Sequence, residues 1–387
     1  MARSGDLGLG SRTLLGWVVV VVRCCSLRAG FGLACSRMMG WLRAFFGLLV
    51  VLGLGACSRA APGASPVAGA ARAKVAVLPF ISSAPIFLAK ERGYFAAEGI
   101  EVEVSLFNAA QAVAVAVASG DADFGVTAFT GAFFNLAGKG ALKVVAAQSR
   151  EEPGFEFVAY VASDAAYQAG LRSPGDFVGK RIAISTMGSS FHYALGLLAA
   201  KRGFDLTALE LRPLQSVPNM MAALSGGQVD AALLPANNAH KLVNEAHAHI
   251  VGWVSEETPW QLGALFTSSK HVVERRDYVA RFVKAYQRGL SDYAAAFLKR
   301  DAEGKRVFGA EAEAALPILQ KWVDPKPSAE VVRESANFMD AQGRLRVADI
   351  YAQVAWYKAQ GMLEGPVDPA QFIDLSFVQG HLDIPGK

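Results

Sequence analysis

The sequence predicts an α/β protein made of two similar lobes, each built on an open sheet. Short apolar runs rich in valine and alanine alternate with helical patterns along most of the 387 residues, as in chains that fold into β-α-β units. A chain of this length usually forms about two domains. One turn pattern also occurs twice, in Ala118–Phe124 and in Leu224–Ala231. In each, a predicted helix ends in Ser-Gly, an aspartate follows and an apolar strand begins.

Charge separates the first 56 residues from the remainder. They carry six Arg and one Asp, which leaves 32 basic and 33 acidic residues in the rest of the chain. The basic character therefore belongs to the N-terminal segment, and we expect no nucleic-acid binding. Cysteines stand only at positions 24, 25, 35 and 57, so a chain cut before Cys57 forms no intrachain disulfide.

Residues 1–56 have the pattern of a secretory signal. The apolar runs Leu14–Val22 and Ala44–Leu54 are each shorter than the roughly 20 residues of a membrane-spanning helix. A basic start, a short apolar core and small residues precede Cys57, as in a signal peptide. The ending Leu54-Gly55-Ala56-Cys57 resembles the bacterial lipobox, in which the cysteine thiol receives a diacylglycerol. A plain cleaved signal and an uncleaved anchor are the alternatives.

The true start of translation is expected at Met38 or Met39, because a second signal ahead of a complete one serves no physical purpose. Residues 57–73 are rich in alanine, proline, glycine and serine. We expect them to form a flexible tether between a lipid anchor on Cys57 and the folded body.

The first β-α-β unit runs from Lys74 to Asn108. Lys74–Phe80 reads as a buried strand, and Ser82, Ser83 and Pro85 suit a helix start. Gly93 and Gly99 end that helix, and Glu101–Phe107 alternates as a half-buried strand does. Phe80–Ser83 then stands at a strand carboxyl end and a helix N-terminus, where open α/β sheets bind ligands and where anions are favoured.

The same alternation continues to the end of the chain. We expect further strands at 121–127, 142–148, 209–214, 231–235, 249–255 and 262–268, the last returning to the first sheet. Helices are expected at 109–119, 131–137, 187–203, 219–224 and 239–247. A helical C-terminal part follows, with helices at 278–298, 311–323, 329–339 and 347–361.

The segment Ala84–Val102 resembles the opening of the substrate-binding proteins of ABC transporters. It reads Ala-Pro-Ile-Phe-Leu-Ala-Lys-Glu-Arg-Gly-Tyr-Phe-Ala-Ala-Glu-Gly-Ile-Glu-Val. The branch it resembles takes aliphatic sulfonates, taurine, nitrate or thiamine precursors. The resemblance implies the two-lobed type II fold of periplasmic binding proteins, with extra C-terminal helices and a ligand between the lobes. Lobe 1 would be residues 74–160 with 262–387, and lobe 2 residues 161–261.

Predicted loops at the carboxyl ends of strands supply hydroxyls, amides and aromatic rings that suit a small polar ligand. The serines also suit helix caps and the phenylalanines also suit a core, so structural roles stay open for them. The candidate binding residues are Phe80, Ser82, Ser83, Asn108, Gln111, Thr127, Phe129, Thr130, Met187, Ser189, Ser190, Phe191, His192, Asn219 and Asn237.

One departure from the family pattern bears on the ligand. Family members commonly carry Glu-Pro after the strand that matches Ala231–Leu234, whereas this chain has Pro235 followed by Asn237 and Asn238. The missing acidic residue argues against a cationic or amine-bearing ligand and leaves a neutral polar or anionic one. No arginine stands in the four predicted binding loops, residues 81–83, 108–111, 127–130 and 186–193, so an anion would depend on helix N-termini and amides.

We expect no metal and no organic cofactor. His240, His247 and His249 lie close in sequence, but the last two straddle a helix end and no Cys or Asp joins them. The leading interpretation is a monomeric, lipid-anchored solute-binding protein outside the cytoplasm. It would deliver a sulfonate, nitrate-like ion, pyrimidine or aromatic acid to the permease and ATPase of an ABC importer.

Two alternatives belong to other functional classes. The first is an enzyme of the related pyrimidine-synthesis branch, for which His192 is the best-placed catalytic candidate. The second is a sensor subunit that reports ligand occupancy to a membrane receptor.

Overall fold

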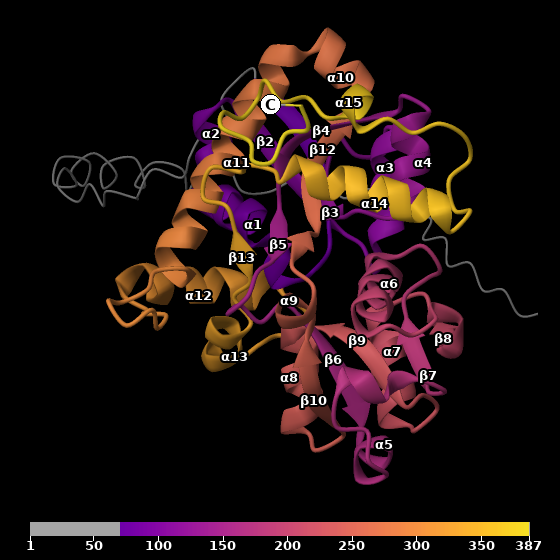
Figure 1. Ribbon diagram of the computed structural model, residues 1–387. Coiled ribbons are helices and arrows are strands. Elements are labelled where there is room, and N and C mark those ends of the chain that lie inside the picture. The colour runs from indigo at the N-terminus through magenta and orange to yellow at the C-terminus, as the bar shows by residue number, and fades with distance from the viewer. Residues whose placement is uncertain (1–69, 387) are drawn as a thin grey trace, which may run out of the picture. The chain divides into compact units, whose positions relative to one another are not determined.

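The computed structural model describes residues 70–386 (Figure 1). The predicted signal segment, Cys57 and the tether up to residue 69 lie outside the described residues. Between residues 70 and 386, no helix combines the length and the apolar character needed to cross a membrane.

The first sheet has the strand order β2-β1-β3-β12-β4. β1 pairs in parallel with β2 and β3, whereas β12 lies antiparallel between β3 and β4. β3 and β4 are buried along almost their whole length, which explains their nearly continuous run of apolar and small residues. The strands are β1 (Ala71–Val77), β2 (Ile100–Leu106), β3 (Phe124–Ala128), β4 (Leu142–Ala147) and β12 (Gly263–Ser268).

The second sheet has the order β10-β6-β9-β7-β8. Read from β8 to β10, this order has the same pattern as the first sheet read from β2 to β4. In each sheet one strand, β12 or β6, runs antiparallel to both neighbours. We call the residues around the first sheet lobe 1 and those around the second sheet lobe 2. The strands are β6 (Val158–Ser163), β7 (Arg181–Ile184), β8 (Glu210–Pro213), β9 (Ala231–Pro235) and β10 (Ala248–Trp253).

The two Ser-Gly turns of the sequence fall at equivalent places in the two sheets. The first leads from α3 (Ala110–Ser119) into β3, and the second leads from α7 (Val217–Ser225) into β9. β3 and β9 hold the same position in their strand orders, which agrees with the predicted α/β fold of two similar lobes. β6 belongs to the second sheet, so a lobe boundary at residue 160 falls inside a strand, and we propose the boundary just before Val158.

Helices cover the faces of both sheets (Figure 1). Those of lobe 1 are α1 (Ala84–Glu91), α2 (Tyr94–Ala97), α3, α4 (Gly131–Gly138), α10 (Ser269–Glu274), α11 (Arg276–Phe297), α12 (Ala310–Trp322), α13 (Ala329–Glu334), α14 (Val347–Ala359) and α15 (Pro369–Phe372). Those of lobe 2 are α5 (Asp164–Gln168), α6 (Ser190–Arg202), α7, α8 (Ala236–Asn244) and α9 (Val254–Glu257). Short 3-10 turns cover Ile81–Ser83, Pro174–Phe177 and Leu206–Ala208.

The longest helix, α11, completes the core of lobe 1. Phe282 on α11 stacks on Phe124 of β3, with ring centroids 3.6 Å apart and planes at 7°. Phe95 of α2 contacts the same Phe282 ring at 4.6 Å. Aromatic stacking of this kind adds to the free energy gained by burial, so α11 holds the first β-α-β unit in place.

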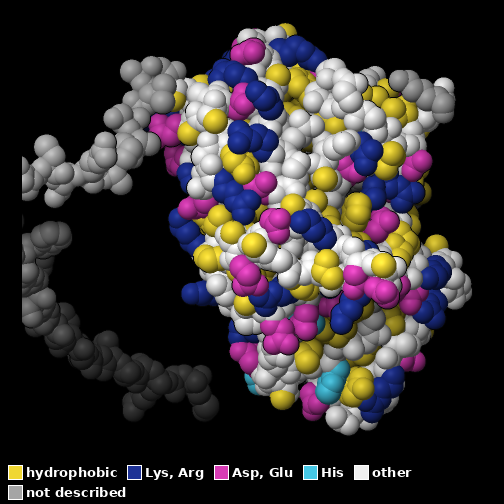
Figure 2. Space-filling model, turned by 90° about the vertical axis from the view of Figure 1, so that its left-hand side faces the viewer, with side chains coloured by type: hydrophobic (Ala, Val, Ile, Leu, Met, Phe, Trp, Pro, Cys, Tyr) yellow, Lys and Arg dark blue, Asp and Glu magenta, His cyan; other side chains and the backbone are white. Residues whose placement is uncertain are grey.

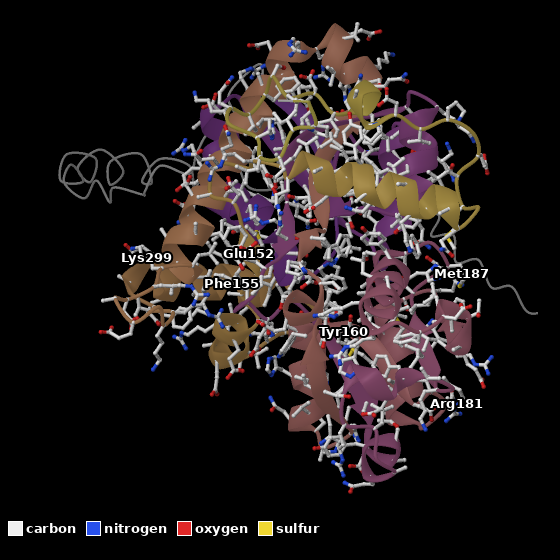
Figure 3. The ribbon with its side chains drawn as sticks, in the orientation of Figure 1. Glu152, Phe155, Tyr160, Arg181, Met187 and Lys299 are labelled. Atoms are coloured by element: carbon white, nitrogen blue, oxygen red, sulfur yellow. The ribbon has the colours of Figure 1, made fainter. Side chains whose placement is uncertain are left out.

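A third, small sheet joins the two lobes, with the order β11-β5-β13. β5 (Ser149–Glu151) is on the chain segment that leaves lobe 1, and β11 (Trp260–Gln261) is on the segment that returns to it. The two pair antiparallel through Glu151–Trp260 and Arg150–Gln261. We call this sheet the hinge strip, and Glu152 and Phe155 in Figure 3 mark the crossing that follows β5.

The third strand of the hinge strip corrects one predicted helix. Residues 329–339 were expected to be helical throughout, but α13 ends at Glu334 and Phe338–Met339 forms β13. Phe338 pairs with Arg150 and also lies under its guanidinium, 4.4 Å from the ring centroid. The free energy of these tertiary contacts outweighs the local helical preference.

The surface shows no single-sign field on the face drawn in Figure 2, where basic and acidic side chains are interspersed. This distribution agrees with the near balance of charge after residue 56. It gives that face no electrostatic preference for polyanions.

Candidate functional site

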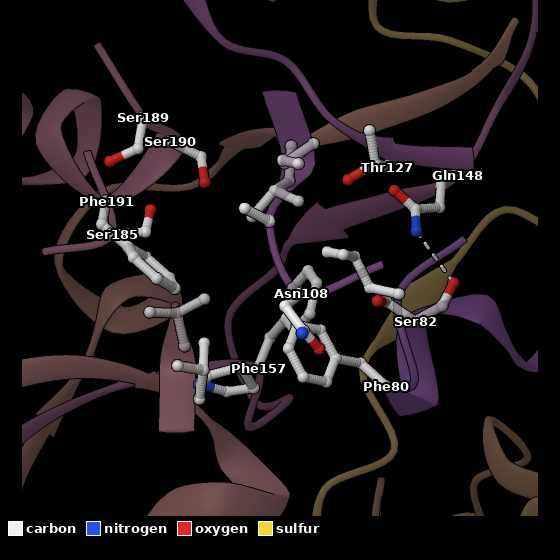
Figure 4. A pocket seen from close by; sticks show the side chains of 18 residues that line it. Phe80, Ser82, Asn108, Thr127, Gln148, Phe157, Ser185, Ser189, Ser190 and Phe191 are labelled. Carbon is white, nitrogen blue, oxygen red and sulfur yellow. Dashed lines mark hydrogen bonds between the residues drawn. The ribbon is translucent and has the colours of Figure 1, made fainter. Parts of the chain in front are cut away.

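A cavity of about 600 Å³, a figure that includes solvent at its mouth, lies between the two lobes. Lobe 1 contributes the carboxyl end of β3 and residues that follow β1, β2 and β4, and lobe 2 contributes the start of α6, the residue after β7 and the end of β9. Figure 4 shows the serines of lobe 2 facing Thr127, Gln148 and Ser82 of lobe 1 across this space. We call it the inner cavity.

Residues at or near the N-termini of four helices line the inner cavity. Ser82 precedes α1, Ala110 begins α3, Ser190 begins α6 and Val217 begins α7, and all four residues line the space. The first N–H groups of a helix have no partner within the helix and carry a partial positive charge. The N-cap of α3 is Ala109, which makes no side-chain cap, so the first N–H groups of α3 have no side-chain acceptor at that position.

Two buried polar atoms of the inner cavity have no hydrogen-bond partner. They are the Thr127 hydroxyl and the side-chain oxygen of Gln148, and both residues are 2% exposed. The Gln148 amide nitrogen donates to the Ser82 carbonyl at 3.0 Å, which fixes the orientation of the side chain. Gly263 makes room for this arrangement, because a Cβ there would overlap the Thr127 carbonyl and the Gln148 amide oxygen. Buried polar atoms without a protein partner mark places where a ligand or water completes the bonding.

The remaining wall of the inner cavity is apolar. Phe80, Phe157 and Phe191 contribute rings, and Leu78, Val158, Val217, Pro235 and Leu262 contribute aliphatic surface. Among the residues that line this cavity in the described part of the chain, none is charged at neutral pH. The site therefore offers dipoles, hydroxyls and apolar contact rather than a counter-charge.

The structure brings seven of the predicted residues together around the inner cavity. They are Phe80, Ser82, Asn108, Thr127, Ser189, Ser190 and Phe191. Ser189 also caps α6, accepting a bond from the His192 amide at 3.3 Å, so capping and cavity lining coexist at one residue. Their contact with a ligand stays a prediction.

The other predicted residues of lobe 1 lie outside the lining of the inner cavity. Ser83 is fully buried, and Phe129 packs against the rings of Phe133 and Phe134. The Thr130 hydroxyl caps α4, accepting a bond from the Phe133 amide at 3.1 Å. Gln111 has a different position, because its amide oxygen accepts a 3.3 Å hydrogen bond from Thr186 of lobe 2.

The other predicted residues of lobe 2 also lie apart from the inner cavity. Met187 is 53% exposed and lies at the outer edge of lobe 2 (Figure 3). Asn219 donates to the Leu214 carbonyl at 2.9 Å, and Asn237 is 4% exposed with its amide nitrogen unpartnered. His192 accepts a 3.1 Å bond from the Gly188 amide on Nδ1, and burial lowers its pKa to about 4. Its ring lines a separate groove beside Trp356, so the catalytic candidate of the enzyme alternative does not face the inner cavity.

The histidines that lie close in sequence are engaged in separate pairs. His240 contacts Glu156 at 2.8 Å, and His249 contacts Asp164 at 2.9 Å. Between residues 70 and 386, no group of three or more His, Cys, Asp or Glu side chains is arranged to hold a metal ion.

Sequence reasoning missed Gln148, Phe157 and Ser185, which all line the inner cavity. Ser185 follows β7 directly, at the position equivalent to the predicted loop after β1, so the repeated strand plan was a usable signal. Gln148 and Phe157 flank β5 on the crossing between the lobes. Nothing in the local sequence marks that crossing as part of the site.

The family model described as NMT1/THI5 like matches residues 81–296, more than half of the chain. The chain belongs to this family. The matched range runs from the turn after β1 to the end of α11 and contains every residue that lines the inner cavity except Leu78 and Phe80. No curated protein sequence matches this member of the family.

Solved structures share the fold at low sequence identity. The ligand-binding component of an ABC-type import system from Staphylococcus aureus, with zinc bound, has a TM-score of 0.63 and 15% identity, over 81% of this chain and 100% of that one. The alkanesulfonate-binding protein SsuA from Xanthomonas axonopodis pv. citri, bound to MOPS, has a TM-score of 0.62 and 19% identity, over 79% of this chain and 98% of that one. The periplasmic nitrate-binding protein NrtA from Synechocystis has a TM-score of 0.59 and 14% identity, over 77% of this chain and 83% of that one. This NMT1/THI5-like chain therefore has the fold of periplasmic binding proteins.

Proposed function

We propose that this protein captures a small organic solute bearing an oxyanion, such as a sulfonate or carboxylate, and delivers it to an ABC importer. The observation that carries the proposal is the presence of residues from four helix N-terminal regions around a cavity whose Thr127 hydroxyl lacks a partner. The unpartnered Gln148 oxygen can only accept a hydrogen bond, so it would take a donor group of the same solute or a water molecule. The solved structures of similar fold include sulfonate- and nitrate-binding proteins, which agrees with this ligand class.

The electrostatics of the inner cavity favour an anion without a salt bridge. Each helix N-terminus carries roughly half a unit of positive charge and contributes about 0.3–1 kcal/mol to a nearby anion, or up to about 2 kcal/mol when partly buried. Four such ends, with the Ser189, Ser190 and Thr127 hydroxyls as donors, supply several favourable contacts. Fixed dipoles of this kind hold an oxyanion without a buried counter-ion.

Ligand binding is proposed to close the two lobes on each other. The Gly131 amide of lobe 1 donates to the Gly188 carbonyl of lobe 2 at 2.9 Å, and the Tyr357 hydroxyl of α14 donates to the Ser189 carbonyl at 3.1 Å. These bonds depend on the lobes being close together. A solute that touches both lobes adds to them and favours the closed state.

The cellular setting belongs to the same proposal. The lipobox-like Leu54–Cys57 implies a lipid anchor on Cys57 that holds a monomeric binding protein outside the cytoplasm, beside its permease and ATPase. In cells expressing Cys57→Ser, the protein should move from the membrane fraction to the soluble fraction. Unchanged membrane retention would contradict the anchor while leaving solute binding open.

The ligand class is tested by calorimetry and thermal unfolding of the purified protein with nitrate, methanesulfonate, taurine, benzoate and chloride. A ligand at 100 times its dissociation constant stabilises the folded state by about 2.7 kcal/mol, which gives a clear rise in melting temperature. We expect at least one organic oxyanion to bind and chloride not to bind. If no oxyanion changes the melting temperature, the proposed ligand class is wrong.

A further inference from the structure

A second cavity opens directly beside the inner cavity. It has a volume of about 670 Å³, again with solvent at its mouth included, and we call it the outer chamber. Phe80 and Asn108 line both spaces, and their side chains lie next to each other in the view of Figure 4. These two side chains therefore form the boundary between the inner cavity and the outer chamber.

One side of the outer chamber is apolar. Pro79, Pro218, Met221 and Pro325 supply an apolar lining, and prolines and methionine donate no side-chain hydrogen bond. Val217, at the start of α7, lines the inner cavity, whereas the next residue, Pro218, lines the outer chamber. This side of the outer chamber is thus suited to an apolar group.

One buried amide gives the outer chamber a specific polar feature. Asn238 is 2% exposed, and its side-chain nitrogen contacts the Met221 sulfur at 3.3 Å. Its side-chain oxygen has no hydrogen-bond partner. A buried acceptor of this kind is satisfied by a hydroxyl or amino group that reaches it.

The charges at the outer chamber do not add a site for an anion. Lys241 lines it but already pairs with Glu245 one helical turn away. Asp324 lines it with the opposite charge and is exposed at the surface. The two side chains carry opposite charges, so their effects on a group that enters the chamber partly cancel. Such a group gains apolar contact and one hydrogen bond rather than a salt bridge.

We infer that the ligand has two parts: an oxyanion head in the inner cavity and an apolar body that passes Phe80 and Asn108 into the outer chamber. There, a hydroxyl or amino group at the far end donates to Asn238. This inference rests on the proposed function for the head group and goes beyond it for the body.

The test is calorimetry of the whole protein with three probes: methanesulfonate, 1-hexanesulfonate and 6-hydroxyhexane-1-sulfonate. Each methylene that enters an apolar chamber strengthens binding about fourfold. Hexanesulfonate should therefore bind at least tenfold more tightly than methanesulfonate, and the hydroxylated probe should bind more tightly still.

Two variants locate the effect. Met221→Trp fills the outer chamber and should reduce hexanesulfonate affinity to the level of methanesulfonate, with methanesulfonate affinity unchanged. Asn238→Leu should remove only the advantage of the hydroxyl. Val273→Trp adds the same indole at a residue that is 80% exposed on α10 and should change no affinity. Unchanged methanesulfonate binding shows that a variant is folded.

The outcomes separate the two proposals. If methanesulfonate binds but chain length has no effect, or if Met221→Trp weakens all three probes equally, the outer chamber is not a ligand subsite and the head-group proposal stands. If the wild-type protein binds no probe, the oxyanion head group is wrong and the two-part ligand falls with it.

Discussion

Replacing Thr127 by valine tests two effects of its hydroxyl: the loss of stability that it causes without a ligand, and the affinity that it adds when a ligand is bound. Thr127 is 2% exposed and its hydroxyl has no partner. An unsatisfied buried polar group costs about 1–3 kcal/mol. Thr127→Val removes the hydroxyl with little change of shape, so the ligand-free protein should become more stable by about 1 kcal/mol or more, a rise of about 2–4 °C in melting temperature per kcal/mol.

The same change should weaken binding. A hydrogen bond to a charged group is worth about 1.5–3 kcal/mol, so the affinity for an oxyanion should fall about 10- to 150-fold. Thermal unfolding without ligand and calorimetry with ligand measure the two effects on one preparation.

Thr130→Val is the matched control for this experiment. The Thr130 hydroxyl caps α4, so its loss should lower the free energy of unfolding by about 1 kcal/mol and leave the affinity unchanged. The reasoning is refuted if Thr127→Val is less stable than the wild type and binds the ligand equally well, because the hydroxyl would then have its partner within the fold.

Four further substitutions test the contact between α6 and α14 and the protonation of His192 on α6. A methyl group on Gly196 would overlap the Trp356 ring, so Gly196→Ala should lower the free energy of unfolding by about 1–3 kcal/mol in urea titration, and the double variant with Trp356→Leu should recover most of it. Tyr357→Phe removes the bond to the Ser189 carbonyl and should weaken ligand binding up to about tenfold by calorimetry. Burial lowers the pKa of His192 from 6.5 to about 4; between these values the unfolded chain binds a proton that the folded chain does not, so stability should fall as pH drops from about 6.5 to about 4. His192→Asn should flatten the plot of melting temperature against pH in this range. An unchanged slope would show that other groups cause the loss of stability.

The parts of the site that follow single strands could be predicted from the sequence. Ser82, Asn108 and Ser189 stand where an apolar run gives way to a helix start, and all three line the inner cavity. This works because the carboxyl ends of parallel strands meet at one edge of a sheet. The position of a loop is thus encoded locally even when the strand order is not.

The orientation of a side chain within such a loop is not encoded in the same way. Thr127 lines the inner cavity, but Phe129, two residues later, packs on Phe133 of α4. Asn238 lines the outer chamber while its neighbour Asn237 does not. A shift of one or two residues along the chain decides whether a side chain lines a cavity, and packing in three dimensions sets that position.

To predict that Gln148 lines the inner cavity, one would need to know the strand order. It follows β4, which is separated from β1 by β3 and β12, yet its amide reaches the Ser82 carbonyl after β1. β12 comes from a segment more than a hundred residues further along the chain. The strands of the hinge strip have only two or three residues each, too few for any periodicity to be detected.

The hinge strip limits how the protein moves. The outgoing and returning chain segments are bonded to each other through β5 and β11, so neither slides along the other without breaking those bonds. We therefore expect twisting and shearing of one lobe against the other to be resisted, which leaves a swing about a line across the strip. A single pair of dyes, one on each side of this line, should then report the full course of opening with one distance.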